Sequence, residues 1–279
     1  YIRCATTTLY RGLKLFFSLN AMDERIASQH ERGKWASSLQ TREAYPLHPA
    51  DLSKSGVMAN QHSSIRAALD ARLKATLPSC HLEQAALPLC PSIELALLQS
   101  DLPQGPLAHD EMLAVLNQPA YWAFCWASGQ VLARLLLTEP DLVRDRAIVD
   151  FGAGSGVVGI AAKIAGASRV ICCDLDDDAR LACQVNAEIN DVELEICEDL
   201  RHIDGVADLL VAADVLYDRD NLPLLDLLPN HATRILLADS RIKNFAHPNY
   251  ALIGCETATT WPDLDEQKTF NEVKIYQSI

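Results

Sequence analysis

The sequence predicts an α/β fold built on a doubly wound, mostly parallel sheet. From residue 147 onward, short runs of β-branched and apolar residues alternate with segments of helical periodicity. Parallel strands joined by right-handed helical crossovers produce this alternation. A glycine cluster lies between the first run and the first helix, which is where such sheets bind ligands. We therefore expect the functional residues at the carboxyl ends of the strands.

Each element has its own sequence signal. A helix at 63–76 and a strand at 93–98 precede a Pro- and Gly-containing loop at 101–110, and a second helix is expected at 128–137. Strands of the sheet are expected at 147–151, 169–174, 192–197, 208–213, 234–238 and 273–279. Helices between them are expected at 157–165, 177–189 and 221–228.

The charge of the chain divides at Met58. Residues 1–57 carry 8 basic and 5 acidic side chains, whereas residues 58–279 carry 16 basic and 32 acidic ones. The first segment shows no sustained periodicity, and we expect it to be a disordered extension or the product of an over-long reading frame. A helical lead-in over 58–118 and one main domain over 119–279 would follow it.

Composition excludes several classes of protein. The net charge of −13 argues against a surface that neutralises nucleic-acid phosphates, and the charge-free stretch 120–133 is too short to span a membrane. The nine cysteines form no Cys-x-x-Cys pair, which predicts no metal site and no disulfide framework but buried thiols in a reducing compartment. We expect the cytoplasm, with the mitochondrial matrix as the alternative because residues 1–22 are basic and lack acids.

The glycine cluster reads Asp150-Phe-Gly-Ala-Gly-Ser-Gly156 and opens a helix. Gly152, Gly154 and Gly156 let backbone N–H groups approach a bound molecule. The overlapping run from Gly154 to Gly159 also matches the dinucleotide fingerprint. However, Asp150 offers a carboxylate for an ammonium group, which favours S-adenosylmethionine over NAD.

Acidic residues also follow later strands. Asp174, with Leu175 after it, can accept hydrogen bonds from ribose hydroxyls in either cofactor, unless it is a solvated acid beside Asp176. The fourth sheet strand ends at Ala213 and runs into Asp214-Val-Leu-Tyr217, where a methyl acceptor would enter. The alternative is that Asp214 caps a helix while the tyrosine packs.

At these residues the chain resembles the seven-strand, Rossmann-like class of S-adenosylmethionine-dependent methyltransferases. Within it, the chain is most similar to the protein lysine methyltransferases that act on the electron-transfer flavoprotein β-subunit and to their bacterial relatives. The resemblance extends from about Pro91 to the C-terminus. Its matching segments are Tyr121–Gln130, Asp150–Gly156, Ala161–Arg169, Asp214–Asp218 and Arg234–Asp239.

The resemblance implies roles for single residues. Asp199 would lie near the adenine amino group, Leu200 over the adenine ring and Trp126 near the cofactor. Asp214 would accept a hydrogen bond from the ε-amine of a lysine, and Tyr217 would line the lysine channel. Where the family often has Trp-Pro-Gly-Gly, this chain has Trp126-Ala-Ser-Gly129.

The expected function is therefore methyl transfer from S-adenosylmethionine to an amine nitrogen, with a protein lysine as the acceptor. The partner would be a protein with an exposed lysine, such as the flavoprotein β-subunit, and neither nucleic acid nor a membrane is expected. Three alternatives stay open: a small-molecule N-methyltransferase of the same fold, an NAD-binding oxidoreductase, and a non-catalytic binding module.

Overall fold

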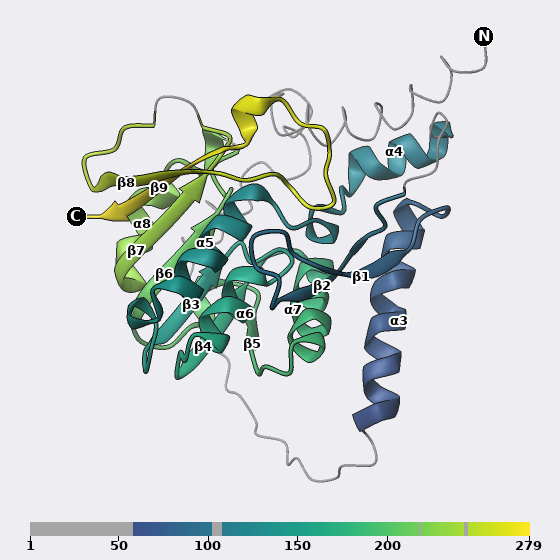
Figure 1. Ribbon diagram of the computed structural model, residues 1–279, viewed down its shortest axis with the longest axis horizontal. Helices are drawn as coiled ribbons and strands as arrows, with labels where there is room; N and C mark the ends of the chain where they lie inside the picture. Colours follow the sequence, from purple (N-terminus) through teal and green to yellow (C-terminus); the bar gives the residue numbers. More distant parts are fainter. Residues whose placement is uncertain (1–57, 102–107, 218, 243–244) are drawn as a thin grey trace.

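The computed structural model describes residues 58–101, 108–217, 219–242 and 245–279 (Figure 1). The expectations for residues 1–57 and for most of the 101–110 loop lie outside the described residues. The helices are α3 (Met58–Thr76), α4 (His109–Asn117), α5 (Ala127–Thr138), α6 (Val157–Ile164), α7 (Asp177–Ile189) and α8 (Leu224–Leu227). The strands are β1 (Leu82–Ala86), β2 (Glu94–Leu98), β3 (Ala147–Phe151), β4 (Arg169–Cys173), β5 (Glu195–Cys197), β6 (Ala207–Ala213), β7 (Ala232–Asp239), β8 (Tyr250–Thr257) and β9 (Glu272–Ser278).

The predicted doubly wound sheet is confirmed. Seven strands pair in the order β5-β4-β3-β6-β7-β9-β8, and the five strands from β5 to β7 run parallel. Strand β9 pairs antiparallel with both of its neighbours. The order reverses at β3, so the chain that follows β3 and β6 lies at the topological switch point, where such sheets bind ligands.

Both faces of the sheet are covered. Alternate residues along β3 point to opposite faces, so Ile148 packs with α5 and α6 whereas Val149 packs with α8. The parallel strands are therefore apolar on both sides, which explains why they appear in the sequence as continuous apolar runs.

Strand β8 and strand β1 were not predicted. Strand β8 forms one edge of the sheet, most of its side chains are exposed, and a bulge between Leu252 and Gly254 breaks its alternation. Strand β5 is three residues long instead of six, and α8 is a single turn flanked by 3₁₀ helices. None of these elements shows the regular spacing of apolar residues by which longer helices and strands are predicted from a sequence.

The lead-in contains strands as well as helices, and the strand predicted at 93–98 is confirmed as β2. Between α3 and α4 it contains an antiparallel hairpin of β1 and β2. Leu69 and Leu73 of α3 are fully buried in a cluster with Val185 of α7, so the lead-in packs on the main domain rather than standing apart from it. Strand β1 has the sequence LEQAA, which contains no β-branched residue, and its strand form depends on pairing with β2.

One buried side chain ties the hairpin to the glycine loop. Asn186 of α7 accepts a hydrogen bond from Ala96 N of β2 at 2.8 Å and donates one to Ser155 O at 2.8 Å. Its side chain is fully buried. The lead-in therefore restrains the loop that follows β3.

We expect Asn186→Ala to lower the free energy of unfolding by about 2–4 kcal/mol, because it leaves two buried backbone groups without partners. Urea unfolding measures this. Asn190→Ala is the matched control, since Asn190 bonds the backbone of Glu94 of the same hairpin in a more exposed position and should cost less. Equal losses in the two variants would contradict this role of Asn186.

Candidate active site

The predicted site residues gather at one edge of the sheet. Asp150 lies near the end of β3, Asp174 follows β4, Asp199 follows β5 and Asp214 follows β6. Parallel pairing places these strand ends side by side. Trp126 reaches the same edge as the residue that precedes α5.

The three glycines after β3 adopt left-handed backbone conformations. Their φ values are +67° at Gly152, +54° at Gly154 and +77° at Gly156. A Cβ on Gly152 would lie 2.7 Å from Val215 Cγ1, and one on Gly156 would lie 3.2 Å from Cys183 Cα. By contrast, a Cβ on Gly154 would meet only the Gly152 carbonyl oxygen, at 4.0 Å. The first and third glycines are thus required by packing, while the second has open space where a side chain would be.

Asp150 holds the glycine loop to α6. Its side chain is 1% exposed, and its Oδ2 accepts a hydrogen bond from Gly159 N at 2.8 Å. Burial raises the pKa of Asp150 to about 7, with the Asp174 carboxylate adding to the rise and the Gly159 N–H opposing it. A contact from Asp150 to an ammonium group stays a prediction.

The raised pKa predicts a pH dependence of stability. As the pH rises from about 4 to 7, unfolded chains release the Asp150 proton while folded chains retain it, so the free energy of unfolding falls. The asparagine of Asp150→Asn does not titrate, so the variant does not share this fall. The difference in the free energy of unfolding between the variant and the wild type should therefore change in favour of the variant by up to about 4 kcal/mol from pH 4 to 7. Urea unfolding at pH 5, 6 and 7 measures the difference, and a constant difference would contradict the prediction.

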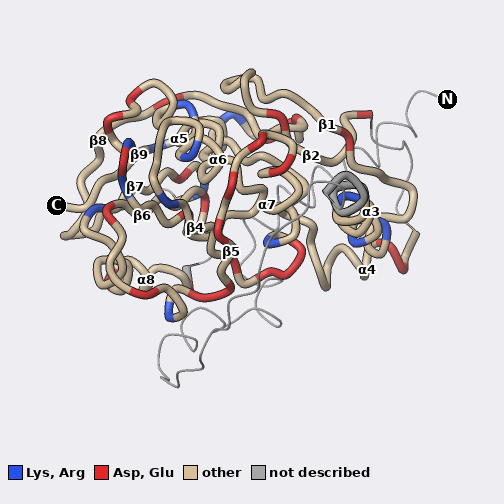
Figure 2. Tube along the Cα trace, turned by 90° about the horizontal axis from the view of Figure 1, so that it is seen from below, with Lys and Arg blue, Asp and Glu red and all other residues tan. Residues whose placement is uncertain are grey.

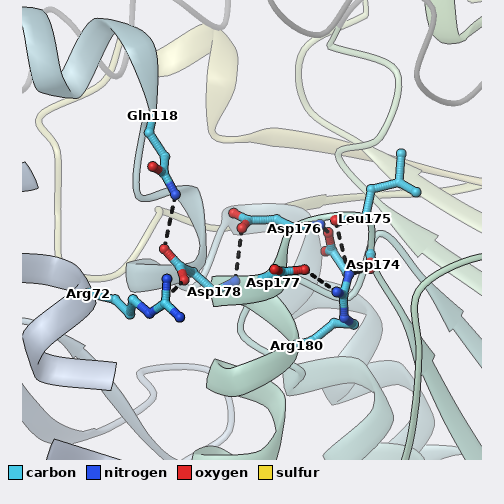
Figure 3. A network of polar contacts seen from close by, with 8 residues as sticks. All are labelled: Arg72, Gln118, Asp174, Leu175, Asp176, Asp177, Asp178 and Arg180. Atoms are coloured by element: carbon cyan, nitrogen blue, oxygen red, sulfur yellow. Dashed lines mark hydrogen bonds and ion pairs between the residues drawn. The ribbon is translucent and has the colours of Figure 1, made fainter. Parts of the chain in front are cut away.

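Asp174 lies directly against the glycine loop. Its Oδ2 accepts a hydrogen bond from Gly154 N at 2.8 Å, and its Oδ1 accepts one from Asp176 N at 3.0 Å. Burial raises the pKa of Asp174 to about 6, against these N–H groups and the Arg180 guanidinium. Arg180 also donates to the carbonyl oxygens of Asp174 and Leu175 (Figure 3). The half-buried carboxylate is thus fixed beside the loop.

The acidic run after β4 is only partly solvated. Figure 3 shows Asp178 pointing toward the lead-in, where it contacts Arg72 at 3.5 Å and Gln118 Nε2 at 3.2 Å. Asp178 is 5% exposed. Asp177, by contrast, points outward and pairs with Arg180. The lead-in therefore contacts the same turn that positions Asp174.

Asp199 is engaged by a neighbouring arginine. Its carboxylate accepts hydrogen bonds from Arg201 Nε at 3.0 Å and Arg201 Nη2 at 2.7 Å, and it caps a 3₁₀ helix. Leu200 is 2% exposed and packs in the core with Phe151 and Ile171. Both residues lie at the expected edge, and their contacts to an adenine ring stay predictions.

Asp214 is held in an unusual conformation. Its φ is +50°, which non-glycine residues rarely adopt, and it is 8% exposed. Oδ1 accepts hydrogen bonds from Ser240 N at 2.8 Å and Ser240 Oγ at 2.9 Å, and among the described residues Oδ2 accepts one, a long hydrogen bond from Ser128 N at 3.3 Å. In the part of its own segment that the structure describes, Asp214 caps no helix, whereas its contact with Ser128 reaches the first turn of α5. Oδ2 therefore keeps capacity to accept a further hydrogen bond.

Aromatic residues lie on the segments that adjoin this carboxylate: Tyr217 follows Asp214 by three residues, and Trp126 lies two residues before Ser128, which donates to it. Tyr217 lies 6.1 Å from Tyr121 between ring centroids, and Tyr121 lies 5.8 Å from Trp126. Trp126 is half-buried and donates from Nε1 to Tyr121 O at 3.0 Å. Ala213, at the end of β6, is also partly exposed. The resemblance assigned roles to Trp126 and Tyr217 but none to Tyr121, and the assigned roles stay predictions.

Four further residues of this edge were missed. Asp239 and Ser240 lie at the end of β7, Arg241 follows them, and Glu266 comes from the segment between β8 and β9. The strand-end rule could have found Asp239, because β7 adjoins β6. Glu266 carries no sequence signal, since its segment is irregular. Within the described residues, no group of three His, Cys, Asp or Glu side chains is arranged to bind a metal ion.

The structure also describes the cysteines and the length of the helices. All eight described cysteines are free, and six of them are buried. In the part of the chain that the structure describes, no helix combines the length and apolar character needed to cross a membrane.

The matching family model and the curated relatives are all methyltransferases. Residues 133–230 match the family model of ribosomal protein L11 methyltransferase (PrmA). The electron transfer flavoprotein beta subunit lysine methyltransferase of Rattus norvegicus is 30% identical, over 75% of this chain and 79% of that protein. The Homo sapiens protein of the same name is 34% identical, over 61% of this chain and 67% of its own. Among solved structures, magnesium protoporphyrin IX methyltransferase from Synechocystis PCC 6803 aligns with a TM-score of 0.44 and 14% identity, over 83% of this chain and 99% of that one.

Proposed function

The chain belongs to the family of electron transfer flavoprotein β-subunit lysine methyltransferases, and we propose that it methylates a lysine of that flavoprotein subunit. It is an S-adenosylmethionine-dependent N-methyltransferase acting on protein lysine. The identity of the acceptor protein is the proposal, and the names of the relatives support it.

The residues present fit S-adenosylmethionine. A Cβ on Gly154 would meet nothing closer than 4.0 Å, so there is open space at this point of the loop, and Asp174, fixed beside it, would accept hydrogen bonds from ribose hydroxyls. Trp126, Leu175, Asp199, Leu200 and Ala213 would complete the cofactor site, with Asp150 holding the loop. The cofactor supplies an electrophilic methyl group on a cationic sulfur.

Asp214 and Tyr217 would act on the acceptor. A lysine attacks only as the neutral amine, so the protein must position the ε-nitrogen and favour loss of its proton. Oδ2 of Asp214 can accept a hydrogen bond from that nitrogen, which directs the lone pair toward the methyl group. Tyr217 and Tyr121 would flank the alkyl chain of the lysine.

Charge favours a cationic substrate. Residues 58–279 carry an excess of 16 acidic side chains, and Figure 2 shows them along much of the described chain, including segments near β5 and α8. Two buried carboxylates, Asp214 and Asp239, lie at the ends of neighbouring strands. Such a field raises the local concentration of a lysine-bearing surface.

The observation that carries this proposal is the buried Asp214 carboxylate at the end of β6, whose Oδ2 accepts one long hydrogen bond and can still accept another. The test uses purified electron transfer flavoprotein incubated with the protein and S-adenosylmethionine, followed by peptide mass spectrometry. We expect methyl groups on lysine of the β-subunit. If that subunit stays unmodified while another protein of a cell lysate is methylated on lysine, the named acceptor is wrong and the enzyme class stands.

A further inference from the structure

Two cysteines lie opposite each other at the carboxyl ends of β4 and β5. Cys173, the last residue of β4, is the register partner of Cys197, the last residue of β5. Register partners on parallel strands point to the same face of a sheet, and both side chains pack in the same apolar cluster. Neighbouring strands are about 4.8 Å apart, which lies within the range of Cα separations that a disulfide bond can bridge.

The two thiols differ in their access to solvent. Cys173 is fully buried, whereas Cys197 is partly exposed on β5, an edge strand of the sheet. The hydrogen bond from the Cys173 thiol lowers the pKa of Cys197 to about 6, although burial opposes this, and the same contact raises the pKa of Cys173. Because the thiolate is the nucleophilic form of cysteine, an oxidant from solvent meets the reactive thiol first, with a second thiol beside it.

Cys197 is also connected to the expected cofactor site. As a thiol it donates a hydrogen bond to Asp199 O at 3.1 Å, and its own carbonyl oxygen accepts one from Asp174 N at 3.1 Å. Asp174 and Asp199 are the two carboxylates expected to contact the adenosine part of the cofactor. A disulfide holds its Cβ atoms about 3.8 Å apart, closer than the strand spacing of about 4.8 Å, so it would displace the end of β5 and remove the hydrogen bond to Asp199 O.

We propose that Cys197 is a site of oxidation by hydroperoxides, that Cys173 converts the oxidised group into a disulfide, and that this disulfide weakens the binding of S-adenosylmethionine. The loss of affinity rests on the proposed cofactor roles of Asp174 and Asp199, whereas the disulfide does not. Because the bond requires the strand ends to move, it should be strained and readily reduced by a thiol, which makes the modification reversible.

The oxidation needs only the peroxide as co-reactant. The Cys197 thiolate attacks one peroxide oxygen, so that an S–O bond forms, the O–O bond breaks and hydroxide leaves. The Cys173 sulfur then attacks the sulfur of this sulfenic acid, so that the S–S bond forms, the S–O bond breaks and water leaves with the Cys173 proton. In sum, two thiols lose two hydrogen atoms, and one hydrogen peroxide molecule is reduced to two water molecules.

A second pair of cysteines provides an internal control. The thiols of Cys172 and Cys183 also form a hydrogen bond with each other, but each residue is 1% exposed. Both pack in the cluster on the other face of the sheet, with α5 and α6. Peroxide that acts from solvent should therefore leave this pair reduced.

The first measurement identifies the bond. The purified protein is treated with hydrogen peroxide, its remaining thiols are blocked with N-ethylmaleimide, and it is digested without reductant. Trypsin yields peptides 170–180 and 181–201, and further cleavage at glutamate separates Cys183 from Cys197. We expect mass spectrometry to find Cys173 linked to Cys197, while Cys172 and Cys183 carry the blocking group.

The second measurement is calorimetry with S-adenosylhomocysteine. We expect the oxidised wild type to bind at least about tenfold more weakly, because a displaced carboxylate loses hydrogen bonds to the ligand, and we expect dithiothreitol to restore the affinity. Cys197→Ser should keep its affinity after peroxide treatment. Cys255→Ser, which removes an exposed thiol on β8, should respond to peroxide as the wild type does.

Two results would overturn the inference: no link between Cys173 and Cys197, or a link that leaves the affinity unchanged. If Cys197→Ser does not fold, recovery of the oxidised wild type with dithiothreitol still tests the inference, since affinity lost through other oxidation would not return. A protein that forms the link and loses affinity, but methylates no lysine of the flavoprotein β-subunit, would refute the proposed acceptor and leave this inference intact.

Discussion

Replacing Asp214 by asparagine is expected to lower kcat for lysine methylation by about 100-fold or more. Asparagine is similar in size and can still accept the hydrogen bonds from Ser240, so the backbone at φ +50° should be retained. It loses the negative charge that makes the carboxylate a strong hydrogen-bond acceptor for the ε-nitrogen and so orients its lone pair. Steady-state kinetics with saturating S-adenosylmethionine measures kcat, and calorimetry with S-adenosylhomocysteine should give an affinity within about threefold of the wild type.

Asp208→Asn is the matched control for this variant. Asp208 lies near the opposite end of the same strand, is exposed and accepts a hydrogen bond from Ala147 N at 2.8 Å. It should keep wild-type kcat. If Asp214→Asn lost cofactor affinity while retaining normal kcat at saturation, Asp214 would belong to the cofactor site rather than to the acceptor site.

Replacing Asp174 by alanine is expected to weaken S-adenosylhomocysteine binding by about 30-fold or more. The carboxylate has two functions in this account: it fixes Gly154 through its N–H, and it would accept hydrogen bonds from both ribose hydroxyls. Hydrogen bonds to a charged group contribute about 1.5–3 kcal/mol each, so losing them costs at least one to two factors of ten. Isothermal calorimetry measures the loss.

Asp177→Ala is the control here, because Asp177 lies three residues away but points outward and pairs only with Arg180 among the contacts shown in Figure 3. The affinity of the Asp177→Ala variant for S-adenosylhomocysteine should change by less than about threefold. Equal weakening by the two substitutions would mean that the acidic run acts through overall charge, and the specific role of Asp174 would be wrong.

Much of the fold could be predicted because buried parallel strands have a strong signature. Strand β3 was predicted at its observed bounds, and α7 likewise, since both combine a clear period with clear ends. Strand β8 could not be predicted. Its side chains are mostly exposed and a bulge interrupts it, so it lacks the alternation of apolar and polar residues by which strands are predicted. Strand β1 is stabilised by its partner rather than by its own residues.

Some residues of the candidate site could be predicted from the sequence and others could not. Asp150, Asp174 and Asp214 could be found because each lies at or just after a strand end in a short motif. The residues that hold them could not, since Ser240 and Glu266 reach Asp214 and Arg241 only through the tertiary fold. The sequence placed Asp199 at the correct edge but gave no sign that Arg201 would engage its carboxylate.

The most direct test of the central claim follows the methyl group itself. The protein is incubated with S-adenosylmethionine labelled in the methyl group and with a cell lysate, in parallel with Asp214→Asn. We predict that the label appears in a protein band, on lysine after hydrolysis, and that the variant loses it. Label in a small molecule, or label of equal intensity with Asp214→Asn, would contradict the account.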